Sequence, residues 1–386
     1  MLKNVRVKKI LKNLIFKPLS CLNKLTVKDD RIILLYISSQ GLRHNLKPLL
    51  EYLVEEGYNE KYTIVCGIEN LKYKGKDYLN VKYVGKLKSV MTFFRAGHVF
   101  YTAGQIPIKP SKEQIVIHMN HGTSDYKTTG ALTNINNGDE FFFTYMTTSG
   151  DYYVPIVARE YLCSEDNVVV CNEPTTSAFY RPLRERYQLG NYDKLLLWLP
   201  TFRRSENLGY SDSPENRVVP LFDADDYNLL NEKLKQYNYK LIVKLHGAQS
   251  LEEYHLSDFS NLSICSNDDF VRLGYDLYQL LMQIDVLIGD YSSVSLQFLL
   301  LDKPCAYVIP DIEEYGRQRG FVFDNPEEYM PGYKIKTQEE FYQFLNDLSL
   351  GNDSYEQERK RVKNIVHKYD DGDACKRLLE LSNIRH

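Results

Sequence analysis

A turn between two apolar segments carries the residues that most clearly suggest chemistry. Asp290, Ser292 and Ser293 follow the short β-branched run Val286 to Ile288, and the apolar side chains of residues 294–301 repeat at helical spacing. The turn therefore joins a buried strand to the start of a helix, where free backbone N–H groups and the helix dipole favour an anion. We predict a phosphate site here; the alternative is that a serine simply caps the helix.

Two histidines follow predicted strands. His246 comes directly after the apolar run 241–245, and His121 follows the run 114–118. At a strand end, His246 can donate to a diphosphate oxygen or, when protonated, neutralise a leaving phosphate; the alternative is a structural histidine. His121 has the chemistry of a general base for an attacking hydroxyl. His118 and His121 lack a third ligand for a metal site, so no metal or other cofactor is predicted, although a divalent metal is not excluded.

Three further polar residues lie near predicted strand ends. Arg203 closes the sequence Pro-Thr-Phe-Arg, and its guanidinium fork matches phosphate oxygens, unless it is an ordinary surface arginine before the loop. Asp311 and Arg319 flank Tyr315 after the apolar run 305–309, where we expect the ribose or base of a nucleotide. We therefore predict that all three belong to a donor-binding site.

The elements that must position these residues alternate between strand and helix. This alternation predicts parallel sheets covered by helices, and hence an α/β protein with two doubly wound Rossmann-like domains. The pattern changes near residues 180–192, and residues 355–383 are expected to form closing helices. The strands are predicted at residues 31–36, 62–66, 81–84, 96–101, 114–118, 141–145, 167–171, 195–199, 241–245, 286–288 and 305–309.

Composition agrees with a folded two-domain protein of 386 residues, 43% of them hydrophobic. The seven cysteines show no C-x-x-C spacing, which favours a reducing compartment over a zinc site or a disulfide framework. The chain contains no phosphate-loop motif, no dinucleotide-binding glycine fingerprint and no serine nucleophile elbow. These searches exclude the commonest motif-defined nucleotide and hydrolase classes.

Charge is distributed unevenly along the chain. Residues 1–28 contain eight lysines and arginines and no acid, so they carry +8 of a net charge of −3, which leaves −11 for the remainder. Apolar side chains alternate with these bases in a run too short to span a bilayer and without a signal cleavage site. We predict a segment that lies on an anionic membrane surface, at the cytoplasmic face of the cell membrane. The alternatives are a solvated basic tail or a nucleic-acid arm.

The candidate residues belong to an ordered set of motifs. The set comprises Asn45, His121-Gly-Thr123, Pro200-Thr-Phe-Arg203, Lys244-Leu-His246, Asp285-Val-Leu-Ile-Gly-Asp-Tyr-Ser-Ser293, Asp302-Lys-Pro304, Pro310-Asp311, Tyr315, Arg319-Gly-Phe321, Asp324 and Pro331-Gly332. In this order the motifs resemble those of the CDP-glycerol glycerophosphotransferase family, the teichoic acid primases and polymerases. The resemblance covers nearly the whole chain after residue 29.

The resemblance implies a GT-B fold, with two domains facing a cleft. Residues 29–185 would form the acceptor-side domain and residues 186–386 the nucleotide-donor domain, after the membrane segment 1–28. His121 would be the base, and His246, Arg203, Ser292 and Ser293 would hold the donor diphosphate. Asp290, Asp311 and Arg319 would belong to the same donor-binding site. This sequence departs from the family pattern at Asn120, at residues 124–126 and at Gln297, which replaces an acid.

The implied function is transfer of a polyol phosphate, and glycerol phosphate from CDP-glycerol is the donor group that we expect first. The acceptor would be a hydroxyl of a lipid-linked or polymeric wall or capsule glycan, and CMP would be released. The partners expected are this donor, this acceptor and an anionic membrane surface, with no nucleic acid. Two alternatives stay open: a GT-B glycosyltransferase that uses a sugar nucleotide, and a non-catalytic member that kept the scaffold.

Overall fold

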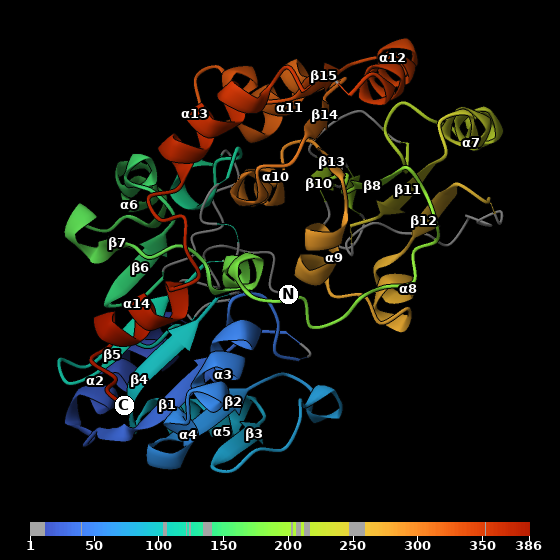
Figure 1. The fold of residues 1–386 in the computed structure, drawn as a ribbon. Helices are drawn as coiled ribbons and strands as arrows, with labels where there is room; N and C mark the ends of the chain where they lie inside the picture. The colour runs from blue at the N-terminus through green and yellow to red at the C-terminus, as the bar shows by residue number, and fades with distance from the viewer. Residues whose placement is uncertain are drawn as a thin grey trace. The chain divides into compact units, whose positions relative to one another are not determined.

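The computed structural model describes residues 12–39, 41–102, 106–120, 122, 125–133, 141–201, 204–205, 210–211, 217–246, 259–351 and 353–386. The chain forms two compact units (Figure 1). Unit 1 contains Met1–Thr123, Gly130–Ser177 and His367–His386, and unit 2 contains Ser124–Thr129 and Ala178–Val366. The division after Ser177 lies close to the predicted one after residue 185, but two segments cross between the units.

The sheet of unit 1 has seven parallel strands in the order β3-β2-β1-β4-β5-β6-β7. Because β1 and β4 are neighbours although β2 and β3 come between them in the chain, the sheet grows outward in both directions, as in a doubly wound fold. The strands are β1 (Asp29–Tyr36), β2 (Thr63–Gly67), β3 (Val81–Val84), β4 (Ala96–Tyr101), β5 (Ile115–His118), β6 (Tyr145–Thr148) and β7 (Val168–Val170).

Helices cover this sheet by burying one apolar stripe each. Leu46, Leu49, Leu50 and Leu53 recur at helical spacing, and all four pack in the core against β1 and β2. The helices of unit 1 are α2 (Lys17–Leu25), α3 (Leu46–Glu55), α4 (Tyr58–Lys61), α5 (Lys86–Phe93), α6 (Val154–Tyr161) and α14 (Ala374–Leu381), with a π-helical turn at Lys12–Phe16 and 3₁₀ turns at Leu71–Tyr73, Gly130–Leu132, Asp151–Tyr153, Glu165–Asn167 and Pro174–Tyr180.

The last helix belongs to unit 1 rather than to the C-terminal domain that the sequence suggested for it. Cys375, Leu378 and Leu379 of α14 are buried in the same core as Leu46, and α14 lies beside the sheet of unit 1 in Figure 1. The apolar stripe of this helix was visible in the sequence. Which of two sheets it covers depends on tertiary packing, which local spacing does not encode.

The sheet of unit 2 has six parallel strands in the order β12-β11-β8-β13-β14-β15. They are β8 (Lys194–Trp198), β11 (Tyr239–Lys244), β12 (Leu262–Cys265), β13 (Val286–Gly289), β14 (Cys305–Val308) and β15 (Tyr333–Ile335), and β9 (Arg204–Ser205) pairs separately with β10 (Tyr210–Ser211). The helices are α7 (Tyr227–Gln236), α8 (Asn267–Arg272), α9 (Leu277–Gln283), α10 (Ser293–Phe298), α11 (Ile312–Arg319), α12 (Gln338–Ser349) and α13 (Glu356–Val366), with 3₁₀ turns at Ala224–Asp226, Leu299–Leu301 and Pro326–Tyr329.

The α/β class with two doubly wound parallel sheets is confirmed, and most predicted strands are present. The predicted strand at residues 141–145 is wrong, because β6 begins only at Tyr145. Phe141 and Phe143 lie instead in an irregular segment, and their rings pack on those of Tyr161 and His118. The sequence reading also missed β12 and β15, two short edge strands.

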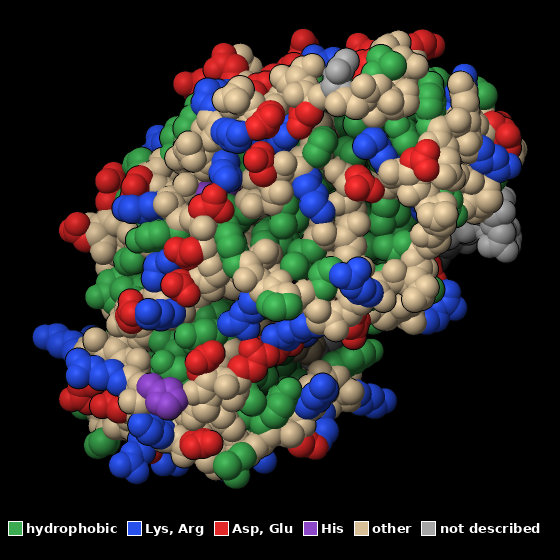
Figure 2. Space-filling model, in the orientation of Figure 1, with side chains coloured by type: hydrophobic (Ala, Val, Ile, Leu, Met, Phe, Trp, Pro, Cys, Tyr) green, Lys and Arg blue, Asp and Glu red, His purple; other side chains and the backbone are tan. Residues whose placement is uncertain are grey.

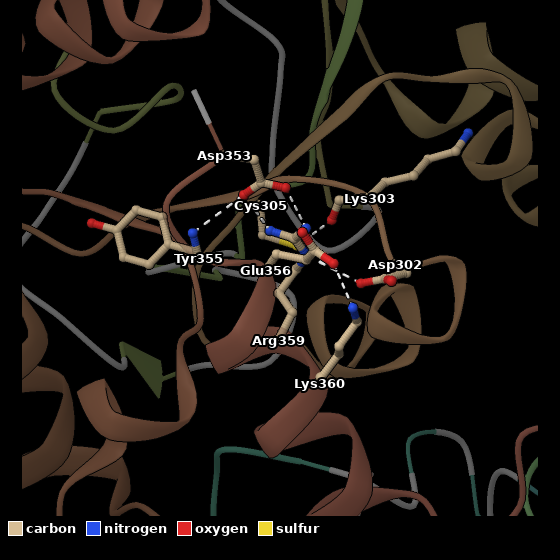
Figure 3. A network of polar contacts seen from close by, with 8 residues as sticks. All are labelled: Asp302, Lys303, Cys305, Asp353, Tyr355, Glu356, Arg359 and Lys360. Atoms are coloured by element: carbon tan, nitrogen blue, oxygen red, sulfur yellow. Dashed lines mark hydrogen bonds and ion pairs between the residues drawn. The ribbon is translucent and has the colours of Figure 1, made fainter. Parts of the chain in front are cut away.

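An ion-pair network fastens α13 to unit 2 (Figure 3). The Arg359 side chain is almost fully buried, donates through both terminal nitrogens to Asp353, and places Nε 3.6 Å from an oxygen of Asp302. Cys305 lies buried beside it at the start of β14. Two carboxylates therefore balance one buried guanidinium, as a buried charge requires.

The N-terminal helix α2 is part of the fold of unit 1 rather than a loose tail. Asn23 is fully buried and donates to the carbonyl of Lys109 and to Gln114, while the Lys28 ammonium donates to the carbonyls of Asn23 and Phe94. Leu22 and Leu25 remain exposed.

No helix in the described part of the chain combines the length and apolar character needed to cross a membrane. On the face drawn in Figure 2, basic and acidic side chains are interspersed.

Candidate functional site

The strand order places one topological switch point inside unit 2. β8 and β13 are neighbours, yet the chain leaves β8 toward β11 and leaves β13 toward β14, so the two loops diverge from adjacent strand ends. In open parallel sheets, ligands bind at this point, outside the carboxyl ends of the strands. Thr201 follows β8 and Asp290 follows β13, so these two residues mark the predicted crevice.

Asp290 and Thr201 hold the two loops together. The Thr201 backbone N–H and hydroxyl donate to the two oxygens of the Asp290 carboxylate at 2.7 and 2.5 Å, and both residues are buried. The sequence placed Asp290 among the phosphate-binding residues. A buried carboxylate that already accepts two hydrogen bonds would repel a phosphate, so we assign Asp290 the role of positioning the turn that carries the serines.

Ser292 and Ser293 begin α10 immediately after this turn. Ser292 has the extended backbone of an N-cap residue, but its hydroxyl makes no capping hydrogen bond. Gly289 permits this close turn, because a Cβ at that position would collide with the Ser295 hydroxyl. The Ser292 side chain therefore does not perform the plain capping role that was the alternative for these serines. Both serines are only partly buried.

His246 follows β11, the strand next to β8. Its side chain reaches solvent, yet the protein packed around it lowers its pKa to about 4; the charges of Lys127 and Lys244 lower it further, and Asp290 opposes them. The imidazole is therefore neutral at pH 7 in the unliganded protein. Lys244, from the same motif, places its ammonium 5.3 Å from the centre of the Phe270 ring.

The predicted residues after β14 surround an aromatic cluster. The Tyr291 hydroxyl donates to Asp311 at 2.9 Å, and the Tyr291 ring stacks on Tyr315 with centroids 4.2 Å apart. Phe321 completes the cluster. Arg319 ends α11, and its Nε atom is buried with no hydrogen-bond acceptor among the described residues. A buried guanidinium N–H without an acceptor is costly, and this unsatisfied donor makes Arg319 a candidate to meet an anion.

Sequence reasoning missed the contribution of residues 125–129. They lie between β5 and the 3₁₀ turn at Gly130, within the predicted N-terminal domain, but they pack in unit 2. Asp125 and Lys127 interact electrostatically with Arg319 and His246, respectively. Residues 124–126 depart from the family pattern, but nothing in the local sequence indicates which sheet this segment joins.

Two predicted residues, His121 and Arg203, lie outside the described residues. The backbone before His121 is held in unit 1: Asn45 donates to the carbonyls of Met119 and Asn120, and Asn120 adopts a left-handed φ of 51°. His118 contacts Met146 and the carbonyl of Thr102 through its two ring nitrogens. Within the described ranges, no group of three or more His, Cys, Asp or Glu side chains is arranged to hold a metal ion.

Gln297, which stands where the family pattern has an acid, is buried in α10. Its amide oxygen accepts from the Tyr278 hydroxyl at 2.9 Å. The neutral amide therefore serves the packing of α9 against α10.

Comparison with known proteins supports the assignment that the motifs suggested. Residues 17–382 match the family model described as CDP-Glycerol:Poly(glycerophosphate) glycerophosphotransferase. The chain belongs to this family. The glycerophosphotransferase match covers both units, and so includes the switch point, residues 125–129 and α14.

Several relatives are bacterial teichoic acid enzymes. The chain is 25% identical over 243 residues to the teichoic acid glycerol-phosphate primase of Bacillus subtilis (strain 168), covering 61% of this chain and 56% of the relative. It is 23% identical over 384 residues to the teichoic acid poly(ribitol-phosphate) polymerase of Bacillus spizizenii (strain ATCC 23059 / NRRL B-14472 / W23), covering 92% of this chain and 56% of the relative. The chain thus spans about half the length of the curated relatives it matches.

Solved structures share the fold. The wall teichoic acid polymerase TagF superposes with a TM-score of 0.71 at 16% identity, covering 98% of this glycerophosphotransferase-family chain and 96% of the TagF chain. A putative UDP-N-acetylglucosamine 2-epimerase from Listeria monocytogenes superposes with a TM-score of 0.53 at 13% identity, covering 91% and 95% of the two chains. At these identities the likeness establishes the fold alone.

Proposed function

We propose that this protein transfers a polyol phosphate from a CDP-activated donor to a hydroxyl of a lipid-linked or polymeric wall glycan. Family membership and the teichoic acid primases and polymerases among its relatives support this reaction class. The observation that carries the proposal is the family match over residues 17–382, which includes the sheet unit that bears the switch-point serines, His246 and Arg319. Because its relatives include both glycerol-phosphate and ribitol-phosphate enzymes, the proposal covers either CDP-polyol.

The chemistry requires positioning more than covalent catalysis. The acceptor oxygen attacks the phosphorus that carries the polyol, the P–O bond to the CMP phosphate breaks, and CMP leaves with the bonding electron pair. We assign removal of the acceptor proton to His121. Ser292, Ser293 and Arg319 donate to the diphosphate oxygens, and His246, neutral before binding, donates one N–H or gains a proton as negative charge approaches.

A product assay tests the proposal. Purified protein is incubated with a lipid-linked glycan acceptor and with CDP-glycerol, CDP-ribitol or UDP-sugars, and the released nucleotide is measured. CMP released from a CDP-polyol, and lost in the His121→Ala variant, supports the proposal. UDP released from a sugar nucleotide would favour a glycosyltransferase instead, and no nucleotide release with any donor would indicate a non-catalytic family member.

We also propose that the N-terminal segment places the protein on an anionic membrane at its cytoplasmic face. The support is that α2 exposes both apolar side chains, Leu22 and Leu25, and basic side chains, Lys17 and Lys24. A helix of this kind can insert its apolar side chains into a membrane surface while its bases meet anionic lipids. Deleting residues 1–28 is a poor test, because it removes Asn23 from the core of unit 1. Substituting Leu22 and Leu25 together by Ser should instead reduce co-sedimentation with anionic liposomes. Leu229→Ser, at an exposed position on α7, is the control, and equal pelleting of all proteins would contradict the proposal.

A further inference from the structure

Residues 125–129 form a segment, here called the strap, that unit 2 holds firmly. Tyr126 is fully buried between Tyr307 and Phe323, and its hydroxyl donates to the carbonyl of Tyr329 at 2.7 Å. The strap pairs antiparallel with the chain that leaves α11: Lys127 forms a bridge with Phe321. The backbone position of Lys127 is therefore fixed beside residues 319–322.

Further hydrogen bonds join the strap to the end of α11. The Val322 N–H donates to the carbonyl of Tyr126 at 2.8 Å, the Thr128 N–H donates to Gly320 at 3.2 Å, and the Thr128 hydroxyl donates to the carbonyl of Arg319 at 2.8 Å. Because both the backbone and a side chain of the strap bond to residues 319–322, the strap and Arg319 should move together.

The charges that meet at this junction are predominantly positive. Lys127 lies close enough to His246 to lower the pKa of the imidazole, and its ammonium makes no ion pair with any described residue. Arg319 contributes the buried Nε that lacks an acceptor in the described chain. Asp125, whose pKa is raised by burial while Lys127 and Arg319 oppose that rise, accepts from the Lys127 backbone N–H at 3.2 Å. Two cations thus share one carboxylate and have capacity for a further anion.

We propose that Lys127 and Arg319 together bind the diphosphate of the donor, so that a residue from the N-terminal half of the chain completes the donor site. This inference rests on the proposed function and adds Lys127 to it as a donor-binding residue. The guanidinium suits two neighbouring oxygens of one phosphate, and the ammonium suits a single oxygen of the other. Asp125 orients Lys127 and balances the two cations before the donor binds.

Calorimetric titration tests the assignment on the full chain with two probes, CDP-glycerol and inorganic pyrophosphate. Lys127→Met should weaken the binding of both probes roughly ten- to hundredfold, the usual effect of losing a hydrogen bond to a charged group. The control is Arg317→Met, an exposed position on α11 whose guanidinium lies 3.8 Å from Glu314, and it should bind both probes as the unmodified protein does.

The outcomes separate this inference from the proposed function. If the unmodified protein binds pyrophosphate but not CDP-glycerol, and Lys127→Met loses pyrophosphate, the two-cation site stands and the proposed donor is wrong. If Lys127→Met binds both probes normally, or if the unmodified protein binds neither, the inference is overturned. An NMR titration without ligand adds an independent reading, because removing the Lys127 charge should raise the pKa of His246 above about 4.

A glycine pair tests whether the strap positions Lys127. Gly320 has a left-handed φ of 85°, and a Cβ there would lie 2.9 Å from the Thr128 hydroxyl; Gly351 has a similar φ of 72° with open space around it. Substitution by Ala strains both backbones, and in Gly320→Ala the contact with Thr128 adds to the loss of stability. Only Gly320→Ala should displace the strap and weaken pyrophosphate binding. Equal binding by the two variants would show that the strap does not position the site.

Discussion

Thr201 donates twice to Asp290, through its backbone N–H and its hydroxyl, and so ties the end of β8 to the end of β13. These are the two neighbouring strands from which the chain diverges. A hydrogen-bonded pair at this point fixes the spacing of the loops between which the donor should lie. We therefore propose that Asp290 acts on the donor through the geometry of the Ser292–Ser293 turn.

We expect Thr201→Val to lower the stability of unit 2 and weaken donor binding. The buried Asp290 carboxylate would lose one donor, at a cost of about 1–3 kcal/mol. Denaturation followed by the fluorescence of Trp198, the single tryptophan of the chain and a buried residue of unit 2, measures this loss. Ser349→Ala is the control within unit 2, because the Ser349 hydroxyl is exposed and donates to the carbonyl of Asn346 at 2.6 Å. Equal stability of the two variants would contradict the prediction.

Donor affinity should rise as the pH falls from 7 toward 5. The pKa of His246 is about 4 in the free protein, and a bound diphosphate should raise it, so the complex takes up a proton between the two pKa values. Each unit by which binding raises that pKa gives up to about a tenfold gain in affinity on the acidic side. The same pH series is measured with His246→Gln, because titration of the nucleotide itself affects both proteins equally and cancels in the comparison. A parallel pH dependence in both proteins would exclude His246 from the site.

Replacing Ser292 and Ser293 together by Ala should weaken donor binding with little loss of stability. Each hydrogen bond to a charged phosphate is worth roughly 1.5–3 kcal/mol, while no capping bond of Ser292 is lost. Ser266→Ala is the matched control, since the Ser266 hydroxyl does cap α8 within a capping box and its loss should cost about 1 kcal/mol without affecting the donor. Unchanged donor affinity in the double variant would return both serines to a structural role.

Arg359→Met should destabilise unit 2 by about 3 kcal/mol at pH 7, near the lower end for breaking a buried ion pair because Asp353 and Asp302 are partly exposed. The hydrogen bond from Arg359 lowers the pKa of Asp353 in the folded protein. The stabilisation that the Asp353 carboxylate contributes is therefore fully present above its pKa in the unfolded chain, about 3.9. This stabilisation is lost as the pH falls through the lower pKa of Asp353 in the folded protein.

Denaturation at a series of pH values, followed by Trp198 fluorescence, measures this dependence. The difference between Arg359→Met and the unmodified protein should shrink on acidification below pH 4, and a constant difference would contradict the role of Asp353. Lys360→Ala serves as the control, because Lys360 is solvent-exposed and pairs with the exposed Glu356 beside the same network (Figure 3).

The sequence by itself determined the local features of this protein. Apolar runs located most strands, helical spacing located the stripes of α3 and α14, and motif order placed His246, Asp290, Ser292 and Arg319 at or beyond strand ends and indicated the family. These features depend on neighbours within a few residues, so periodicity and motif spacing are sufficient to reveal them.

Tertiary structure decided which of these local pieces meet. The strand order puts β8 beside β13, the core of unit 1 takes α14, and unit 2 takes Lys127 together with Arg319. The same packing leaves the Ser292 hydroxyl without a capping bond and lowers the pKa of His246. Each of these outcomes depends on contacts between residues far apart in the chain and on the burial those contacts create, and neither quantity is contained in a local sequence pattern.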